Sequence, residues 1–306
     1  MKIKGEGGVR MNPAILSKWK KRGIRLVGKS LLFLLLFGFC FLILYPFVLK
    51  ILSACKDPVD LYDKTVGLIP KHVSSYYFEL ALQNLDVLHS GMNTLVLSLL
   101  ASGAQVITCT MVAYGLARFR FRGRGLLFLL VILVLLVPPQ FYNVALYLRI
   151  RSLGLLNNPL SIFLLSITGI GFKSGLYIYL LRNFFVNLPK ELESAAYVDG
   201  AGPFTAFLRV ILPNASLMMS TVFLFSFCWQ WTDTFYTDLL FSKYSTLGKV
   251  ISGIQIYNAA GKWFDGYATT IVQNAACILM LLPLLLVFLL CQKFLIKSIA
   301  TSGLAN

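Results

Sequence analysis

Residues Gly23–Ser30 match the phosphate-binding pattern G-x-x-x-x-G-K-S letter for letter, and taken alone they would indicate an ATPase. Such a loop binds phosphate because it joins a buried strand to the N-terminus of a helix. Here a basic stretch, Trp19–Arg22, precedes it and a long apolar run follows it. We therefore interpret Arg25 and Lys29 as charges that anchor a membrane span at the interface, and we expect no nucleotide site here.

Cysteine and histidine are the other residue types that could act as nucleophiles or metal ligands. The six cysteines show neither CxxC nor Cys/His spacing, and five of them lie inside apolar segments. A membrane-embedded enzyme would need paired His or carboxylates within its spans, but His72 and His89 fall in one loop outside them. The sequence therefore predicts no catalytic residue, no metal site and no cofactor bound by this chain.

The segment 182–213 differs in composition from the apolar sequence around it. Pro189 fits the start of a helix, and Glu191 and Glu193 would lie in its first turn, where carboxylates complement the helix dipole. Three small residues follow, at Ala195, Ala196 and Ala201, and their side chains would project little from the helix surface. A helix of this kind could dock into a groove on a partner. It could equally be an amphipathic connector, and the residues alone leave both interpretations open.

The second half of this segment predicts a turn and a second short helix. Gly200 and Gly202 allow the turn, and Pro203 can open a helix over Phe204–Val210. Pro213 then marks the start of the next apolar run.

Membrane spans are the elements that must position this segment. The chain of 306 residues is 58% hydrophobic and 13% charged, whereas soluble proteins are about 45–50% apolar and about 25% charged. Windows of about 19 residues predict six helices, each long enough to cross the bilayer. The first is too long for the apolar core of a signal peptide, so we expect it to remain as an anchor. The predicted spans are Leu31–Ala54, Asn93–Ala117, Gly125–Ala145, Ser161–Leu181, Ala215–Trp231 and Ala268–Cys291.

Basic residues predict how these spans are oriented. The N-terminal segment, the connections that follow the second and fourth spans, and the tail carry 18 Lys and Arg, against eight in the opposite loops. The positive-inside rule therefore places both termini in the cytoplasm, as an even number of spans requires. The net charge of +16 then reflects orientation and contact with anionic headgroups of the lipid bilayer, and we expect no nucleic-acid partner.

Helix-breaking residues occur in four of the six spans: Pro46, Pro138–Pro139, Gly169–Gly171 and Pro283. Irregular backbone at membrane depth is tolerated where helices pack together or line a watery cavity, which would suit a transporter. Pro and Gly are also simply commoner in membrane helices than in soluble ones, so each break has a second explanation.

Polar residues inside the spans are candidates for a translocation pathway. Lys173 lies within the fourth span and should face a partner or a polar cavity, and Asp233 is one candidate partner. Amide donors and aromatic faces suit a sugar, whose hydroxyls take hydrogen bonds while its C–H faces stack. The same residues could instead hold helices together. The candidate pathway residues are Lys173, Gln230, Trp231, Asp233, Gln273 and Asn274.

The string from Glu191 to Ala201, ELESAAYVDGA, followed by Ile211-Leu212-Pro213, resembles the EAA loop of permease subunits of bacterial ABC importers. This motif, with the P-F-x-x-F that follows it, looks like that of the carbohydrate-uptake branch, the family of the maltose permease subunit. The residues Tyr114–Gly123 and Leu153–Asn157 also resemble that family.

The resemblance implies an all-α integral membrane protein of the bacterial cytoplasmic membrane, with six spans and a coupling helix between the fourth and the fifth. Its partners would be a second permease subunit in a heterodimer, two ATPase subunits that bind ATP and Mg, an extracellular solute-binding protein, and a sugar or oligosaccharide. The domains would be a basic segment 1–30, a membrane domain 31–292 and a tail 293–306. ATPase coupling would fall to Glu191, Glu193, Ser194, Ala195, Ala196, Asp199, Gly200, Ala201, Pro203 and Pro213.

One residue departs from the family pattern: Ser194 stands where the family usually has a Glu that is thought to contact the ATPase. Glu191 or Glu193 could take over that contact, or the contact could be weaker here. A stand-alone channel or secondary transporter is the alternative function, but it would leave the ELESAAYVDGA loop without a purpose. It also predicts an inverted pair of interrupted spans, which we do not find.

Overall fold

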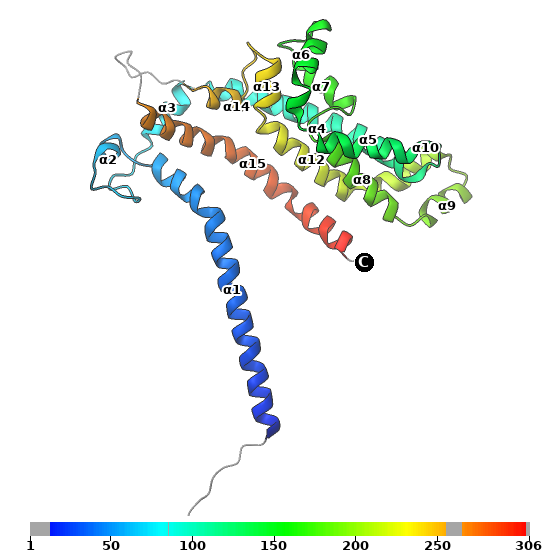
Figure 1. The fold of residues 1–306 in the computed structure, drawn as a ribbon, viewed down its shortest axis with the longest axis horizontal. Helices are drawn as coiled ribbons and strands as arrows, with labels where there is room; N and C mark the ends of the chain where they lie inside the picture. Colours follow the sequence, from blue (N-terminus) through cyan, green and yellow to red (C-terminus); the bar gives the residue numbers. More distant parts are fainter. Residues whose placement is uncertain (1–12, 85, 255–264, 304–306) are drawn as a thin grey trace, which may run out of the picture. The chain divides into compact units, whose positions relative to one another are not determined.

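The computed structural model describes residues 13–84, 86–254 and 265–303 (Figure 1), and within these ranges the regular structure is helical. An isolated antiparallel bridge joins Lys56 to Val73 in a loop. The chain divides into two compact units, Met1–Ser75 and Tyr76–Asn306.

The first unit consists of a long helix and a loop. Helix α1 (Pro13–Ala54) is apolar over Arg25–Ala54, and nearly all of its apolar side chains are exposed, as suits contact with lipid. Residues Gly23–Ser30 are part of this helix, so the geometry of a phosphate-binding loop is absent from them. A short helix, α2 (Pro58–Tyr62), lies in the loop that follows.

The core of the second unit is built around α4 (Val87–Arg118), which contains the second predicted span. It packs against α8 (Ser174–Asn187) and α12 (Ser216–Trp231), and α12 packs in turn against α15 (Gly266–Gly303) (Figure 1). Small residues are buried along α4, including Ala101, Ala104 and Ala113, and they let neighbouring helix backbones approach closely. The second unit also contains the shorter helices α3 (Tyr76–Asn84), α13 (Phe235–Leu240) and α14 (Leu247–Ser252).

The third predicted span is broken at its prolines. Helix α5 (Arg124–Leu136) ends before Pro138, a short turn η1 (Pro139–Phe141) follows, and α6 (Asn143–Ser152) continues the chain. Pro has no N–H to donate and disfavours helical backbone in the preceding residue, so two in succession stop the helix. The predicted break at Pro138–Pro139 is therefore confirmed.

The fourth predicted span is also two helices, α7 (Leu160–Ile167) and α8. Gly169 adopts φ 77°, and the N–H groups of Gly169 and Ile170 donate to the carbonyls of Ser166 and Leu165. This pair of bonds is the Schellman arrangement that ends a helix and usually needs Gly at the left-handed position. The sequence prediction of a break at Gly169–Gly171 is confirmed.

The predictions at Pro46 and Pro283 are wrong, because α1 and α15 continue through these residues. A proline removes one backbone hydrogen bond, which bends a helix more readily than it ends one when apolar residues continue on both sides. Within the described ranges, three helices are long and apolar enough to cross a membrane: Arg25–Ala54, Val87–Arg118 and Gly266–Leu295. The fifth predicted span coincides with α12, which is bent by 72° from the preceding Pro203–Asn214 segment.

Candidate functional site

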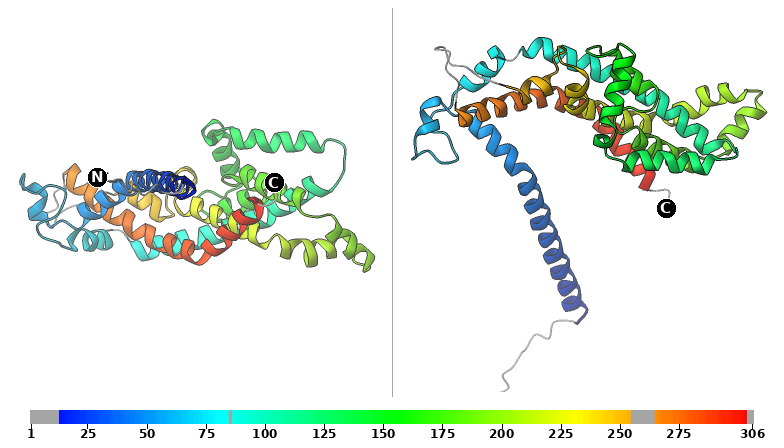
Figure 2. Two further views of the ribbon diagram at one scale, coloured as in Figure 1. Left: turned by 90° about the horizontal axis from the view of Figure 1, so that it is seen from below. Right: turned by 45° about the horizontal axis from the view of Figure 1, so that its top comes forward.

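The segment that resembles a coupling loop lies at one end of the second unit (Figure 2). Helix α9 (Glu191–Val198) begins two residues after Pro189, with Glu191 and Glu193 in its first turn as the sequence predicts. It ends in a second Schellman arrangement: Gly200 adopts φ 83°, its N–H donates to the carbonyl of Tyr197, and the N–H of Ala201 donates to that of Ala196. Gly200 therefore sets the direction in which the chain leaves the helix.

The chain after this turn enters the next span through irregular helix. It forms α10 (Pro203–Ala206), a π-helical turn η2 (Phe207–Ile211) and α11 (Leu212–Asn214). Pro213 has no backbone N–H to donate. The side-chain amide nitrogen of Asn214 donates to the Val210 carbonyl at 2.7 Å. Turns of π-helix inside α-helices are frequent at functional positions, and this one lies beside the 72° bend.

An ion pair ties α9 to the end of α4. The Nε atom of Arg118 lies 3.1 Å from Oε1 of Glu193, and the two side chains are only 5% and 13% exposed. The same guanidinium donates to the carbonyl of Leu188, at 2.6 Å from Nη2. One arginine thus binds both the start of α9 and the connection that precedes it, and sequence reasoning had assigned Arg118 only to the orientation of the membrane domain.

A cluster of aromatic side chains joins the segment 182–213, which we call the coupling segment, to α4. The ring centroids of Tyr114 and Phe207 are 4.5 Å apart, and those of Tyr114 and Phe185 are 5.6 Å apart. Leu192 of α9 packs against this cluster, and Ala196 and Ala206 are buried. Because α4, α8, α9 and η2 all contribute to it, movement of α9 would be transmitted to two helices of the core.

The other side of α9 is exposed. Glu191, Ser194, Ala195 and Val198 follow helical spacing and are all exposed, with Val198 87% exposed. Phe204, on α10, is 67% exposed. We call these five residues the outer face of the coupling segment. The predicted residues Asp199, Gly200, Pro203 and Pro213 are exposed too, whereas Ala201 is half-buried.

A second cluster surrounds the break in the fourth predicted span. Lys173 adopts φ 61° at the start of α8, and its Nζ atom lies 5.2 Å from the ring centroid of Trp229 and 5.5 Å from that of Phe172. Cation–π contacts of this kind contribute about 0.5–2 kcal/mol each. On insertion scales a lysine at membrane depth costs about 2.5–3.5 kcal/mol, a cost that two such contacts could offset in part.

Gln105 of α4 holds this break in place, and sequence reasoning missed it. Its amide nitrogen donates to the Phe172 carbonyl at 2.9 Å and to Ser174 Oγ at 3.1 Å, and its amide oxygen accepts from Ser226 of α12. A Cβ atom on Gly171 would lie 2.4 Å from the Gln105 amide nitrogen and 3.0 Å from the Cα atom of Ser166, so a side chain there would displace Gln105. A buried Gln in a predicted span was the signal that could have found this cluster.

Among the described residues, no ion pair joins Lys173 to Asp233, and the contacts of the other candidate pathway residues are with other partners where they are known. Asp233, the candidate partner, accepts from the backbone N–H groups of Tyr236 and Thr237 at 3.2 and 3.0 Å and so caps α13. Trp231 donates to the Met280 carbonyl and joins α12 to α15. The other three are the buried Gln230, Gln273, whose amide nitrogen lies 3.4 Å from the Ile251 carbonyl, and the half-buried Asn274.

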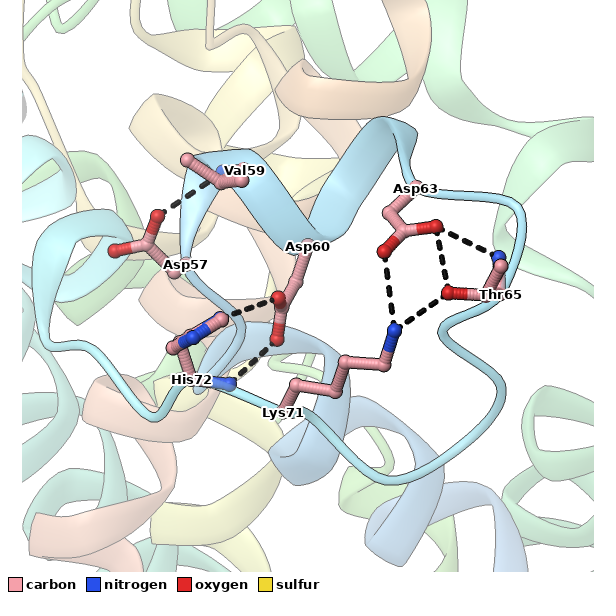
Figure 3. A network of polar contacts seen from close by, with 7 residues as sticks. All are labelled: Asp57, Val59, Asp60, Asp63, Thr65, Lys71 and His72. Atoms are coloured by element: carbon pink, nitrogen blue, oxygen red, sulfur yellow. Dashed lines mark hydrogen bonds and ion pairs between the residues drawn. The ribbon is translucent and has the colours of Figure 1, made fainter.

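The loop after α1 is organised by carboxylates (Figure 3). Asp60 accepts from the backbone N–H of His72 at 2.7 Å, and its other oxygen lies 2.9 Å from His72 Nδ1. Asp63 accepts from the N–H and hydroxyl of Thr65 and pairs with Lys71 at 3.2 Å. The backbone N–H of His72 lowers the pKa of Asp60, and the bonds from Thr65 and Lys71 lower that of Asp63 to about 2.

Comparison with known proteins gives a consistent result. Residues 108–301 match the family described as "Binding-protein-dependent transport system inner membrane component". The probable ABC transporter permease protein YurM of Bacillus subtilis is 28% identical over 90% of this chain and 89% of its own length. The maltose/maltodextrin transport system permease protein MalG of Yersinia pestis is 27% identical over 93% and 95%.

The fold matches as well. A chain from the crystal structure of a bacterial ABC transporter involved in the import of the acidic polysaccharide alginate superposes with a TM-score of 0.70. The match covers 89% of this chain and 97% of that chain at 24% identity. The family match spans well over half of the sequence, and it contains the α9 segment and the broken fourth span. This chain therefore belongs to the inner-membrane components of binding-protein-dependent transport systems, the membrane permease subunits of ABC importers.

Proposed function

We propose that this chain is the membrane-spanning subunit of an importer for a sugar or an oligosaccharide, and that a separate ATPase supplies the energy. Support for a sugar comes from the relative named as a maltose/maltodextrin permease, which aligns over 93% of this chain. Aromatic rings beside hydrogen-bonding groups, at Phe172, Trp229 and Tyr236, support it too. The chain itself would carry no catalytic residue; ATP and Mg would bind to the ATPase subunits.

We place six spans in the bacterial cytoplasmic membrane, with both termini in the cytoplasm. Three would be the long helices of α1, α4 and α15, and α12 would be a fourth. The other two would be the broken pairs α5–α6 and α7–α8, whose interruptions are tolerated if they face a cavity or a neighbouring helix. The distribution of Lys and Arg supports this orientation.

Helix α9 would be the coupling helix. Its inner side is fixed by the ion pair of Arg118 with Glu193, which is the single observation that carries this assignment. The outer face of the coupling segment presents apolar groups, Val198 and Phe204, next to small and acidic residues, and such a surface fits a groove on a partner. Closure of the ATPase would move α9 as a rigid body, and Arg118 would pass the movement to α4.

The assembly would contain a second permease subunit, two ATPase subunits and an external solute-binding protein. Exposed apolar side chains on α1, α5 and α15 would meet lipid or the second permease. The ordered loop of Asp60 and Asp63 would lie on the outer side, where the solute-binding protein docks.

Copurification tests the proposal. The tagged chain should be expressed together with the permease and ATPase genes beside its own, and extracted in mild detergent. We expect an ATPase to copurify with the wild type and with the control variant Lys64→Gln in the outer loop, but not with Val198→Arg, which places a charge on the outer face of the coupling segment. A wild-type chain that transports a sugar with no ATPase bound would refute the proposal and support a stand-alone transporter.

A further inference from the structure

Lys173 carries a positive charge within the fourth predicted span, and the ion pairs among the described residues do not include it. Its backbone is left-handed, with φ 61°, a conformation that is uncommon for any residue with a side chain except Asn and Asp. Such conformations persist where the surrounding structure enforces them, and they cluster at functional sites. Here the bonds from Gln105 to Phe172 and Ser174 enforce it on both sides of Lys173.

The surroundings of Lys173 locate its ammonium group without neutralising it. Phe172 and Trp229 offer ring faces at 5.5 and 5.2 Å, and aromatic rings carry no net charge. The start of α8 follows directly, so the positive end of a 14-residue helix adds to the local potential. Asp233, the candidate partner, accepts hydrogen bonds from the backbone of α13 instead.

Lys173 also lines a cavity of about 230 Å³, together with Pro139, Tyr142 and Tyr236. The hydroxyl groups of Tyr142 and Tyr236 lie 3.2 Å apart and provide hydrogen-bonding capacity there. Pockets for drug-sized ligands measure about 300–1,000 Å³. This cavity is smaller, so it suits one sugar ring, or one acidic substituent of a longer saccharide.

We propose that the pathway is selective for acidic saccharides, and that Lys173 binds a carboxylate of a uronic acid unit while the sugar ring lies in the cavity beside Tyr142 and Tyr236. This inference rests on the proposed function and names its substrate class. Lys173, Tyr142 and Tyr236 all line this cavity, so a sugar ring bound there would have both an ammonium group and hydroxyl groups within its site. A neutral sugar would use the tyrosine hydroxyls but leave the charge of Lys173 uncompensated.

The test uses the complete complex of both permeases and the ATPases in lipid nanodiscs, without the solute-binding protein, so that selection by that protein does not enter. Binding of trigalacturonate is compared with that of the matching neutral trisaccharide, galactotriose, by saturation-transfer NMR. We expect the wild type to prefer the acidic trisaccharide at least tenfold. Lys173→Met should remove the preference, whereas Lys173→Arg should keep it. Lys243→Met, which removes one exposed positive charge elsewhere, is the control for net charge.

Three results would overturn the inference: no preference in the wild type, a preference that survives in Lys173→Met, or an equal loss in Lys243→Met. Failure of Lys173→Met to retain the second permease during purification would also overturn it, because the counter-ion would then belong to that subunit. These results differ from failure of the proposed function, which would appear as a wild-type chain that binds no ATPase.

Discussion

The Nε atom of Arg118, at the end of α4, lies 3.1 Å from Oε1 of Glu193 in the first turn of α9, and both side chains are almost fully buried. This contact joins the long central helix of the second unit to the short helix at its end. Glu193 is therefore occupied within its own subunit, so of the two acids in α9 only Glu191 lies on the outer face of the coupling segment.

Glu193→Gln should destabilise the coupling segment and reduce solute-stimulated ATP hydrolysis. Removing one partner of a buried ion pair costs about 3–5 kcal/mol, because the other charge stays buried and unpaired. The thermal unfolding of the purified complex and its ATPase rate measure the two effects. Glu191→Gln, on the exposed side of the same turn, is the matched control and should leave unfolding unchanged. A Glu193→Gln complex as stable as the wild type would show that Arg118 does not depend on this carboxylate.

Substitutions at Gly200 should separate turn geometry from partner contact. A Cβ atom there meets nothing within 4 Å in this chain, but φ 83° disfavours residues other than glycine. Asn tolerates left-handed backbone better than Ala does. If only the turn matters, the Gly200→Asn complex should keep more of its solute-stimulated ATP hydrolysis than the Gly200→Ala complex. We expect both variants to lose this stimulation, because any side chain would also meet the ATPase.

Gly200→Asp should leave the protein in the membrane and abolish solute-stimulated ATP hydrolysis. It adds both a side chain and a negative charge to the exposed turn beside the outer face of the coupling segment. Membrane fractionation and the ATPase rate in proteoliposomes measure the two properties. Normal stimulation at normal expression would contradict the assignment of α9 as the coupling helix.

The sequence was sufficient to predict the helices and several of their ends. Apolar runs predicted α4, α12 and α15 because lipid and tight packing both demand apolar side chains, and local signals such as Gly169 and Pro138–Pro139 predicted the breaks. It was not sufficient to predict which helices continue through a proline, because packing and solvation decide that. The sequence also could not predict the ion pair of Arg118 with Glu193. The two residues lie in distant segments, and an arginine at the end of a span is already explained by membrane orientation.

Ser194→Glu should strengthen binding of the ATPase. Ser194 lies on the outer face of the coupling segment, and its hydroxyl donates only to the Lys190 carbonyl of the preceding turn, at 3.3 Å. A carboxylate at this exposed position would restore the residue that is usual in the family, with little effect on the stability of α9. The retention of ATPase during size-exclusion chromatography at increasing salt measures the effect. Ala195→Glu, one position along, is the control; an equal gain there would indicate general attraction between charges.

The outer loop should keep its structure across the physiological pH range and lose it only in strong acid. The pKa of Asp63 is lowered to about 2, and that of Asp60 is also lowered, so both carboxylates stabilise the loop fully above their unfolded value of about 3.8. That contribution falls as the pH drops through the folded pKa values. Amide hydrogen exchange of Thr65 and His72 in the full complex, corrected for intrinsic rates, measures it.

Asp60→Asn provides the decisive comparison for this loop. The amide can replace one acceptor but not the charge, so the His72 amide should exchange faster at pH 7, and its protection should fall less in acid than in the wild type. Lys64→Gln is the matched control, because Lys64 is exposed in the same loop and should change neither property. Protection of His72 that is unchanged in Asp60→Asn would mean that the loop is held by its backbone, including the hydrogen bonds beside the bridge of Lys56 with Val73.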